Sequence, residues 1–254
     1  MSVFILYAKV SDSWFIEQYN QYIPLLNHED KNRFNTMKSP LKRQQFLLSR
    51  VLLLQAATQL LQQKSLTLKA EGEPKENSYL EIAQIKTYQI ENYTQLLINQ
   101  KYSFSISITH SGSVAAVCIS SQQLKLGIDI EKIKPRKFVE LAQEFCVEDE
   151  LTLLNNKQYD SYYFYKLWTA KEALTKATQA NLTDLFSFNC SNVLIKNIGT
   201  FNFNHSLFSY NTCNLYNESE TYIGTVVFET LDNKKALSDM CEKAEKISWH
   251  KYKA

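Results

Sequence analysis

The feature that most constrains this chain is a strict alternation of apolar and polar side chains over residues 102–109. Apolar residues stand at every second position from Tyr102 to Ile108, and serines and a threonine fill the positions between them. Because successive side chains of a strand point to opposite faces, this pattern predicts a half-buried strand. Two further apolar runs, at 114–119 and 124–131, follow after short polar turns. Short turns join antiparallel neighbours, so the segment predicts an antiparallel meander.

Helical spacing of apolar residues occurs on both sides of this sheet, most clearly at 40–63 and 161–178. Residues 75–101 are interpreted as an insertion with weak strand character. This order of elements predicts an α+β fold in which helices pack against antiparallel sheets. The other expected elements are helices at 14–26, 137–145 and 148–155, strands at 3–10, 187–194, 201–209 and 221–229, and a polar helix and short strand within 232–254.

Composition excludes several classes of protein. The 254 residues include only five glycines and neither common glycine-rich nucleotide loop, so side chains, a metal or strand-end backbone would have to hold any nucleotide. Lysine and arginine number 28 against 26 aspartate and glutamate, and a net charge of +2 does not indicate a nucleic-acid surface. The five cysteines include no C-x-x-C pair, which favours a reducing, cytoplasmic setting without disulfides or a zinc site.

Asp129 and Glu131 end the third apolar run and form the sharpest local feature. Residues two apart on a strand project from the same face, so both carboxylates would converge on one side. Such close anions repel unless a cation, hydrogen-bond donors or a raised pKa relieves them. An all-oxygen ligand set suits Mg²⁺ or Ca²⁺. The alternative interpretation is a solvated acidic edge beside Lys132 and Lys134.

The helix predicted over 161–178 carries Glu172 and Lys176 on one face. A glutamate four residues before a lysine is the favoured order for a helical ion pair worth about 0.2–0.5 kcal/mol, which is one interpretation of this pair. The functional interpretation places Glu172 opposite Asp129 and Glu131 as a third carboxylate for the same ion. Lys176, one turn further along, would then reach a phosphate oxygen as a point charge.

Residues 107–112, with the sequence S-I-T-H-S-G, end the alternating strand. A hydrolase-type pairing of His110 with Ser111 is sterically awkward because the two residues are neighbours in the chain. Strand-end backbone N–H groups followed by Gly112 can hold an anion, and His110 can donate a hydrogen bond to a phosphate. A structural or surface histidine is the alternative interpretation.

Four motifs in this order resemble the 4′-phosphopantetheinyl transferases, and most closely the larger, two-lobed type that modifies carrier proteins. The two specific motifs are G-I-D-I-E at 127–131 and W-x-x-K-E-A-x-x-K at 168–176. S-I-T-H-S-G at 107–112 stands where the family has N-x-S-H-S. K-R-Q-Q-F-L-L-S-R at 42–50 is similar to the family's basic helix, whose pattern is approximately R-x-x-F-x-x-x-R. The well-matched region is 102–182.

The resemblance implies two similar α+β lobes related by a pseudo-twofold axis, with coenzyme A bound in the cleft between them. We expect an N-terminal lobe over 1–110 and a C-terminal lobe over 111–254. The resemblance also implies that three carboxylates hold Mg²⁺ against the pyrophosphate of coenzyme A. These metal ligands are Asp129, Glu131 and Glu172.

Further roles follow from the same resemblance. Glu172 and Lys176 are the expected catalytic residues, the first as the general base and the second in contact with the pyrophosphate. Arg50 and His110 would contact the nucleotide end, particularly its 3′-phosphate, and Arg43 is a further candidate for that role. The expected coenzyme A-binding residues are Arg43, Arg50, Ser107, Ile108, Thr109, His110, Asp129, Lys171, Glu172 and Lys176, with residues 107–109 acting through their backbone on the adenosine side.

The sequence departs from the family's pattern at several positions. Ser107 and Thr109 stand where N-x-S-H-S has asparagine and serine. Gln179 and Asn181 replace glycines after the K-E-x-x-x-K helix, so this helix must end without the conformational freedom of glycine. The family's G-K-P element has no clean equivalent, and the nearest match is G-E-P-K at 72–75.

The function implied is transfer of 4′-phosphopantetheine from coenzyme A to a serine of an apo acyl or peptidyl carrier protein, with Mg²⁺ as cofactor and release of adenosine 3′,5′-bisphosphate. The pathway, whether fatty-acid, polyketide or nonribosomal peptide synthesis, stays open. We expect a monomer that binds neither nucleic acid nor membrane. Two alternatives remain at this point: a Mg²⁺-dependent nuclease or phosphodiesterase, and a non-catalytic module that binds carrier proteins.

Overall fold

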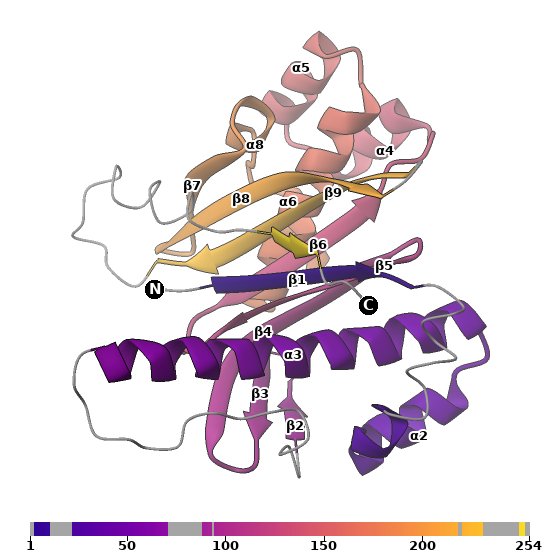
Figure 1. The fold of residues 1–254 in the computed structure, drawn as a ribbon. Helices are drawn as coiled ribbons and strands as arrows, with labels where there is room; N and C mark the ends of the chain where they lie inside the picture. The colour runs from indigo at the N-terminus through magenta and orange to yellow at the C-terminus, as the bar shows by residue number, and fades with distance from the viewer. Residues whose placement is uncertain are drawn as a thin grey trace. The chain divides into compact units, whose positions relative to one another are not determined.

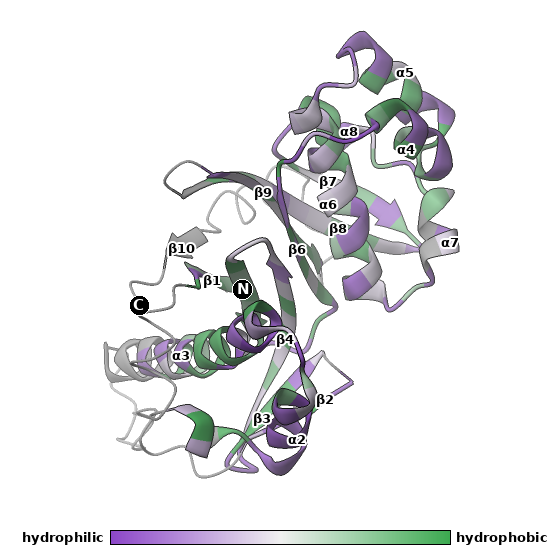
Figure 2. Ribbon diagram, turned by 90° about the vertical axis from the view of Figure 1, so that its right-hand side faces the viewer, coloured by the Kyte–Doolittle hydropathy of each residue, from purple (hydrophilic) through white to green (hydrophobic). Residues whose placement is uncertain are grey.

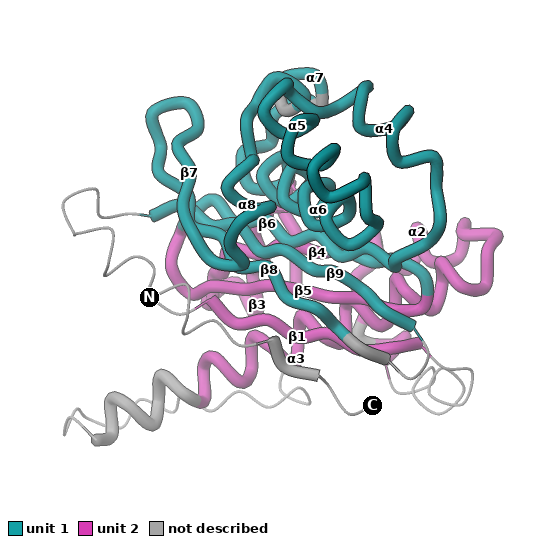
Figure 3. The backbone as a smooth tube through the Cα atoms, turned by 90° about the horizontal axis from the view of Figure 1, so that it is seen from above, with its two compact units in different colours: residues 1, 109–112, 124–248 teal, residues 2–108, 113–123, 249–254 magenta. Residues whose placement is uncertain are grey.

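The computed structural model of the chain describes residues 3–10, 22–70, 88–92, 94–217, 220–230 and 249–251. The chain divides into two compact units, drawn in different colours in Figure 3. Unit 1 comprises residues 1, 109–112 and 124–248, and unit 2 comprises residues 2–108, 113–123 and 249–254. No helix in the described part of the chain combines the length and the apolar character needed to cross a membrane.

Unit 2 contains a six-stranded sheet covered by a long helix. The strand order is β10-β1-β5-β4-β3-β2, and its neighbours with known register are antiparallel except for the parallel pair β1 and β10. The helical elements are a short 3₁₀ helix η1 and the α-helices α2 and α3 (Figure 1). Their bounds are η1 Ile23–Leu25, α2 His28–Thr36, α3 Pro40–Ala70, β1 Val3–Lys9, β2 Tyr88–Glu91, β3 Gln95–Ile98, β4 Tyr102–Ser111, β5 Val114–Ser120 and β10 Trp249–Lys251.

Helix α3 forms the core of unit 2 by packing on β5 and β1. It begins with Pro40, whose fixed φ suits the first helical turn. Its central turns are apolar on nearly every side, as the hydropathy colours in Figure 2 show, and residues 46–48 and 51–54 are buried. A helix that is apolar all round is stable only when it is covered. The sheet, α2 and the β2–β3 hairpin supply that cover.

Unit 1 contains a four-stranded antiparallel sheet with α6 against one face (Figure 1). The strand order is β6-β9-β8-β7, and α6 contacts both β6 and β9. The bounds are β6 Leu126–Lys132, α4 Phe138–Phe145, α5 Glu148–Asn156, α6 Ser161–Thr178, α7 Leu182–Phe186, α8 Asn192–Ile195, β7 Ile198–Phe203, β8 Ser206–Asn217 and β9 Glu220–Glu229.

Gly127 allows α6 to lie directly on β6. A Cβ atom added at Gly127 would lie 1.9 Å from the carbonyl oxygen of Ala173 and 2.7 Å from the backbone nitrogen of Ala177. Both helix residues are small and buried. No other residue type fits at this strand position without moving the helix away, so Gly127 sets the distance between the two elements.

The α+β prediction is confirmed: both units consist of sheets with mainly antiparallel pairing packed against helices. The helix predicted over 161–178 is α6, which begins after Asp160. The Asp160 carboxylate accepts a 2.8 Å hydrogen bond from the backbone N–H of Tyr162. Aspartate at this position satisfies one of the unpaired N–H groups of the first turn.

Three local predictions were wrong because side-chain spacing does not specify a pairing partner. β6 does not join β4 and β5 in a meander: it pairs with β9 in the other sheet. The strand expected over 187–194 is instead a loop followed by α8, and the single strand expected over 201–209 is a hairpin that turns at residues 204–205. Residues 113–123 belong to unit 2, where β5 pairs with β1. The predicted lobes over 1–110 and 111–254 stay a prediction.

Other predicted segments fall partly or wholly outside the described residues. These are the helix at 14–26, the G-E-P-K stretch at 72–75 and the polar helix within 232–254. The insertion predicted over 75–101 is described only from residue 88 onward, where β2 and β3 form an antiparallel hairpin.

A glycine at position 179 should stabilise the protein. Gln179 ends α6 with φ 54° and ψ 27°, a left-handed conformation that costs an L-residue about 1–2 kcal/mol. Glycine avoids this cost, but it lowers the free energy of unfolding by about 0.5–1 kcal/mol because it loses more conformational entropy on folding. We expect Gln179→Gly to raise the free energy of unfolding by about 0.5–1 kcal/mol, measured by urea titration. Gln143→Gly, at an exposed helical position of α4, is the control and should lower it by about 1 kcal/mol. Destabilisation by both changes would contradict the prediction.

Candidate active site

The centre of the candidate site is Asp129, which is 5 % exposed on β6. Its Oδ1 atom accepts two hydrogen bonds, one of 2.7 Å from Lys176 Nζ and one of 3.0 Å from Thr109 Oγ1. Its Oδ2 atom is buried and has no hydrogen-bond partner in the part of the chain that the structure describes. Burial raises the pKa of Asp129, and the charge and hydrogen bond of Lys176 only partly offset that effect.

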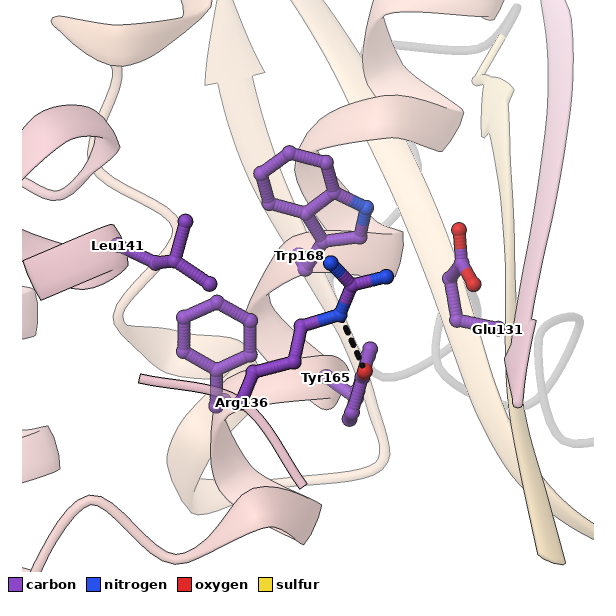
Figure 4. Close-up of a pocket in the computed structure, with 6 residues that line it drawn as sticks. Glu131, Arg136, Leu141, Tyr165 and Trp168 are labelled. Atoms are coloured by element: carbon purple, nitrogen blue, oxygen red, sulfur yellow. Dashed lines mark hydrogen bonds between the residues drawn. The ribbon is translucent and has the colours of Figure 1, made fainter. Parts of the chain in front are cut away.

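Glu131 lies two residues further along β6 and borders a small apolar cavity. Its Oε2 atom accepts a 2.6 Å hydrogen bond from Ser111 Oγ. Burial raises the pKa of Glu131, the hydrogen bond from Ser111 lowers it, and the charge of Asp129 raises it again. The cavity has a volume of about 110 Å³, and Figure 4 shows side chains that line it. The cavity is lined by Glu131, Arg136, Leu141, Phe164, Tyr165 and Trp168.

Glu172 on α6 supplies a third carboxylate to the same region. Burial raises its pKa, and the negative charges of Asp129 and Glu131 raise it further, while Lys176 lowers it. Glu172 thus lies within the electrostatic influence of both carboxylates, and Asp129, Glu131 and Glu172 are together called the carboxylate cluster. Lys176 donates to Ile128 O at 3.1 Å and to Asp129, and it makes no ion pair with Glu172. The helical ion pair considered from the sequence is therefore replaced by a contact between α6 and β6.

The donor set of this cluster fits a hard divalent cation. Within the described ranges, no three acidic, histidine or cysteine side chains already stand in a metal-binding arrangement, and Lys176 is the cation beside Asp129. Asp129 nevertheless raises the pKa of both Glu131 and Glu172, and its own Oδ2 atom is buried without a donor among the described residues. All-oxygen ligands of this kind are those that Mg²⁺ prefers.

Lys171 is also on α6, but in the described part of the chain its amine contacts Glu150 and Phe188 rather than the carboxylate cluster. Its amine is 2.9 Å from Glu150 Oε2 and donates to Phe188 O at 2.7 Å. The side chains of Lys171 and Glu150 are 5 % and 0 % exposed. Glu150 also accepts backbone N–H bonds from Val147 and Cys190. In this structure the charge of Lys171 is thus paired with Glu150, and the expected contact of Lys171 with coenzyme A stays a prediction.

Arg50 and Arg43 lie in unit 2 on α3. Arg50 is 6 % exposed and forms a bidentate ion pair with Asp30, at 2.8 Å from Nε and 2.9 Å from Nη2. Tyr88 OH donates to the same carboxylate at 2.7 Å. The guanidinium of Arg50 is thus buried and paired with Asp30 in this structure, and its expected contact with a coenzyme A phosphate stays a prediction. Arg43 is partly buried, with its guanidinium carbon 4.8 Å from the centroid of the Phe34 ring.

The residues expected on the adenosine side are split between the units. Ser107 and Ile108 belong to unit 2, where Ser107 is buried and Ile108 packs partly against the core. Thr109 and His110 belong to unit 1, where His110 is exposed. The side chain of Thr109 is bonded to Asp129, a role that sequence reasoning missed.

Sequence reasoning also missed Ser111, Arg136 and Tyr165. Arg136 Nε donates to Tyr165 OH at 3.2 Å beside Glu131, as the dashed line in Figure 4 marks. The alternation of β4 was the available signal for Ser111, because residues 107, 109 and 111 share one face of the strand. Nothing local indicated Tyr165, whose place depends on how α6 packs.

Comparison with known proteins identifies the region that carries this cluster. The family model described as the 4′-phosphopantetheinyl transferase superfamily matches residues 125–227, which include β6, α6 and all three carboxylates. This region belongs to the 4′-phosphopantetheinyl transferase superfamily. The resemblance noted from the sequence motifs is thereby confirmed.

Individual relatives carry the same family description. A Synechocystis protein assigned provisionally to these transferases is 27 % identical over 164 residues, which are 62 % of this chain and 58 % of that protein. A Bacillus subtilis 4′-phosphopantetheinyl transferase is 30 % identical over 99 residues, which are 38 % of this chain and 43 % of that protein. The transferase Sfp of Bacillus subtilis strain 168 is 39 % identical over 72 residues, which are 28 % of this chain and 31 % of Sfp. The matched stretches thus span less than two thirds of each relative's length.

Replacement of Lys171 separates a structural role from a phosphate-binding role. Lys171→Met leaves Glu150 as an unpaired buried charge, so we expect a loss of about 3–5 kcal/mol in the free energy of unfolding. The double variant Lys171→Met/Glu150→Gln should recover much of this loss. If Lys171 acts only through Glu150, the dissociation constant of the folded fraction for coenzyme A, measured by calorimetry, should stay within about twofold of wild type. A large rise in that constant with normal stability would support the phosphate role.

The buried amine of Lys166 on α6 predicts a pH dependence of stability. Lys166 is 3 % exposed and forms no ion pair with a described residue, and burial lowers its pKa from 10.5 to about 8. A lysine whose pKa falls on folding destabilises the folded state below pH 8, and this cost disappears as the pH rises from 8 to 10.5. Lys166→Met should therefore raise the free energy of unfolding at pH 7 by about 2–3 kcal/mol and flatten its rise between pH 8 and 10.5. An unchanged pH profile would refute this prediction.

Proposed function

We propose that this chain transfers 4′-phosphopantetheine from coenzyme A to a serine of an apo acyl or peptidyl carrier protein. The observation that carries the proposal is the cluster of Asp129, Glu131, Glu172 and Lys176 inside the region that matches the superfamily. Three carboxylates and one amine at the contact of β6 with α6 suit a reaction in which charge on a pyrophosphate must be neutralised.

Mg²⁺ is the proposed cofactor, with Asp129, Glu131 and Glu172 as its ligands. When bound, it would neutralise charge on the pyrophosphate of coenzyme A. The buried Oδ2 atom of Asp129, which lacks a donor among the described residues, supports the proposed ligand set. Lys176 is 32 % exposed at its side chain and donates two hydrogen bonds, so its amine retains a third donor for a phosphate oxygen.

Glu172 is the proposed general base. It accepts the proton of the carrier serine while the serine oxygen forms a bond to the phosphorus that carries pantetheine. The bond from this phosphorus to the bridging oxygen breaks, and adenosine 3′,5′-bisphosphate leaves. Burial and the neighbouring carboxylates raise the pKa of Glu172, which makes it a stronger base than an exposed glutamate. The nucleophile comes from the partner, so the chain needs no activated serine or cysteine of its own.

The proposed contacts with the nucleotide end are those that the family resemblance implies. His110 is exposed at the end of β4 and remains a proposed ligand of the 3′-phosphate, with Arg43 as a further candidate. The backbone of residues 107–109 remains proposed on the adenosine side. Arg50 and Lys171 form buried ion pairs with Asp30 and Glu150 in this structure, and their contacts with coenzyme A stay predictions. A monomeric state and a cytoplasmic setting stay predictions.

A transfer assay tests the proposal. The protein is incubated with coenzyme A, Mg²⁺ and several apo carrier proteins, and each carrier is weighed by mass spectrometry. We expect a gain of one phosphopantetheine group that disappears when EDTA removes the metal. Asp129→Asn and Glu172→Gln should each lower kcat/KM by about 10²–10⁴-fold, because each removes a ligand or base.

The control for these variants is Glu144→Gln, at an exposed position of α4, which should transfer at the wild-type rate. No transfer to any carrier, where a known transferase succeeds, would overturn the proposal. Cleavage of DNA without reaction of coenzyme A would establish the nuclease alternative. Carrier binding that needs neither Mg²⁺ nor coenzyme A would indicate a non-catalytic module. Near-normal transfer by Glu172→Gln would leave the reaction standing and refute the assigned base.

A further inference from the structure

Two hydroxyl groups near the end of β4 hold the two carboxylates of β6 in the same way. Thr109 Oγ1 accepts a 3.3 Å hydrogen bond from Ile130 N and donates a 3.0 Å bond to Asp129 Oδ1. Ser111 Oγ accepts a 3.1 Å bond from Lys132 N and donates a 2.6 Å bond to Glu131 Oε2. Each hydroxyl thus binds one carboxylate and the backbone N–H of the residue after it.

The repeated pattern arises from the period of the two strands. Thr109 and Ser111 are two residues apart on β4, and Asp129 and Glu131 are two residues apart on β6. Side chains at this spacing project from one face of each strand. Each hydroxyl contacts the carboxylate twenty residues further along the chain, so the two contacts have the same offset and follow both strands in the same direction. Both carboxylates are therefore held by one arrangement with a common register.

Each hydroxyl has a single proton, and the backbone contact determines where that proton goes. The N–H bond fixes the hydroxyl oxygen against β6, and the proton then points to the adjacent carboxylate. One oxygen of each carboxylate is engaged in this way. The second oxygen of Asp129, Oδ2, has no hydrogen-bond partner within the described ranges, and the bond from Ser111 engages Oε2 of Glu131 rather than Oε1. The two hydroxyls thus leave Asp129 Oδ2 and Glu131 Oε1 to a cation.

We propose that Thr109 and Ser111 are positioning residues that hold Asp129 and Glu131 in the orientation that binds a divalent cation. This inference rests on the proposed function, because it deepens the account of the same carboxylate cluster. The family resemblance gives Thr109 only a backbone contact with adenosine and gives Ser111 no role. The side-chain role follows from the four hydrogen bonds alone.

The physical basis is preorganisation of mutually repelling groups. Two carboxylates on one strand face would otherwise turn away from each other or toward solvent. A hydroxyl that is itself held by the backbone removes this freedom before the cation arrives. Hydrogen bonds to metal-ligating carboxylates commonly change metal affinity by about 10–100-fold. The hydroxyls should therefore affect cation affinity more than the chemical step.

Mn²⁺ binding to the full-length chain without substrate tests this inference, because it reads the site without catalysis. Free Mn²⁺ is followed by electron paramagnetic resonance during titration of wild type, Thr109→Val and Ser111→Ala. Valine keeps the shape of threonine without its hydroxyl. We expect each variant to raise the Kd for Mn²⁺ by about tenfold. Thr109→Ser and Ser111→Thr keep the hydroxyl and should stay within about threefold of wild type.

Ser206→Ala is the matched control. Ser206 Oγ donates a 2.9 Å hydrogen bond to Glu229 Oε1, a serine–glutamate contact in unit 1 at the far end of β9 from the carboxylate cluster. Its removal should leave Mn²⁺ affinity unchanged. In the transfer assay, Thr109→Val and Ser111→Ala should raise the KM for Mg²⁺ and retain a kcat within about threefold of wild type at saturating Mg²⁺.

The outcomes separate the inference from the proposed function. If wild type binds Mn²⁺ and both hydroxyl-free variants bind it equally well, the hydroxyls only join β4 to β6, and the positioning role is refuted while the transferase proposal stands. If wild type binds no Mn²⁺, both the positioning role and the metal-dependent mechanism are refuted. Should Thr109→Val fail to fold, Ser111→Ala decides the question, because Ser111 is only half-buried.

Discussion

The direct contact of α6 with β6 is the constraint on which the candidate site depends. It exists because Gly127 has no side chain and because α6 presents Ala173 and Ala177 at that point. With the helix this close, Lys176 Nζ reaches both a backbone carbonyl of β6 and the carboxylate of Asp129. Glu172, one turn earlier, is then brought into the field of Asp129 and Glu131. A larger residue at position 127 would separate the two halves of the cluster while leaving every functional side chain present.

Helix α6 places three lysines in three different electrostatic environments. Lys171 is buried against Glu150 in a complete ion pair, and Lys166 is buried with no ion-pair partner among the described residues. Lys176 is partly exposed and shares Asp129 with the Thr109 hydroxyl. Only Lys176 combines a charge partner with access to solvent, which is the combination that a phosphate-binding residue needs. The difference follows from the angular position of each lysine on the helix.

Much of the fold and of the site could be predicted from local pattern. The limits of α6 agree with the periodicity over 161–178, and the placement of Asp129 and Glu131 on one strand follows from their spacing. The sequence did not indicate that β6 would leave β4 and β5 to pair with β9, since any two strands with one apolar face satisfy the same pattern. The same limit explains the wrong prediction at α8: a short apolar run is compatible with a strand or a helix, and its packing decides between them.

The sequence by itself determined which chemical groups the site contains: carboxylates two apart on a strand, a glutamate and a lysine four apart on a helix, and hydroxyls at alternate positions of β4. These relations lie within single elements, where backbone geometry fixes the spacing. Only the tertiary structure decided which cation meets which carboxylate. It assigned Lys176 to Asp129, Lys171 to Glu150 and Arg50 to Asp30, and it gave Thr109 and Ser111 their carboxylates. Contacts between elements depend on how closely they pack, and no local period encodes that distance.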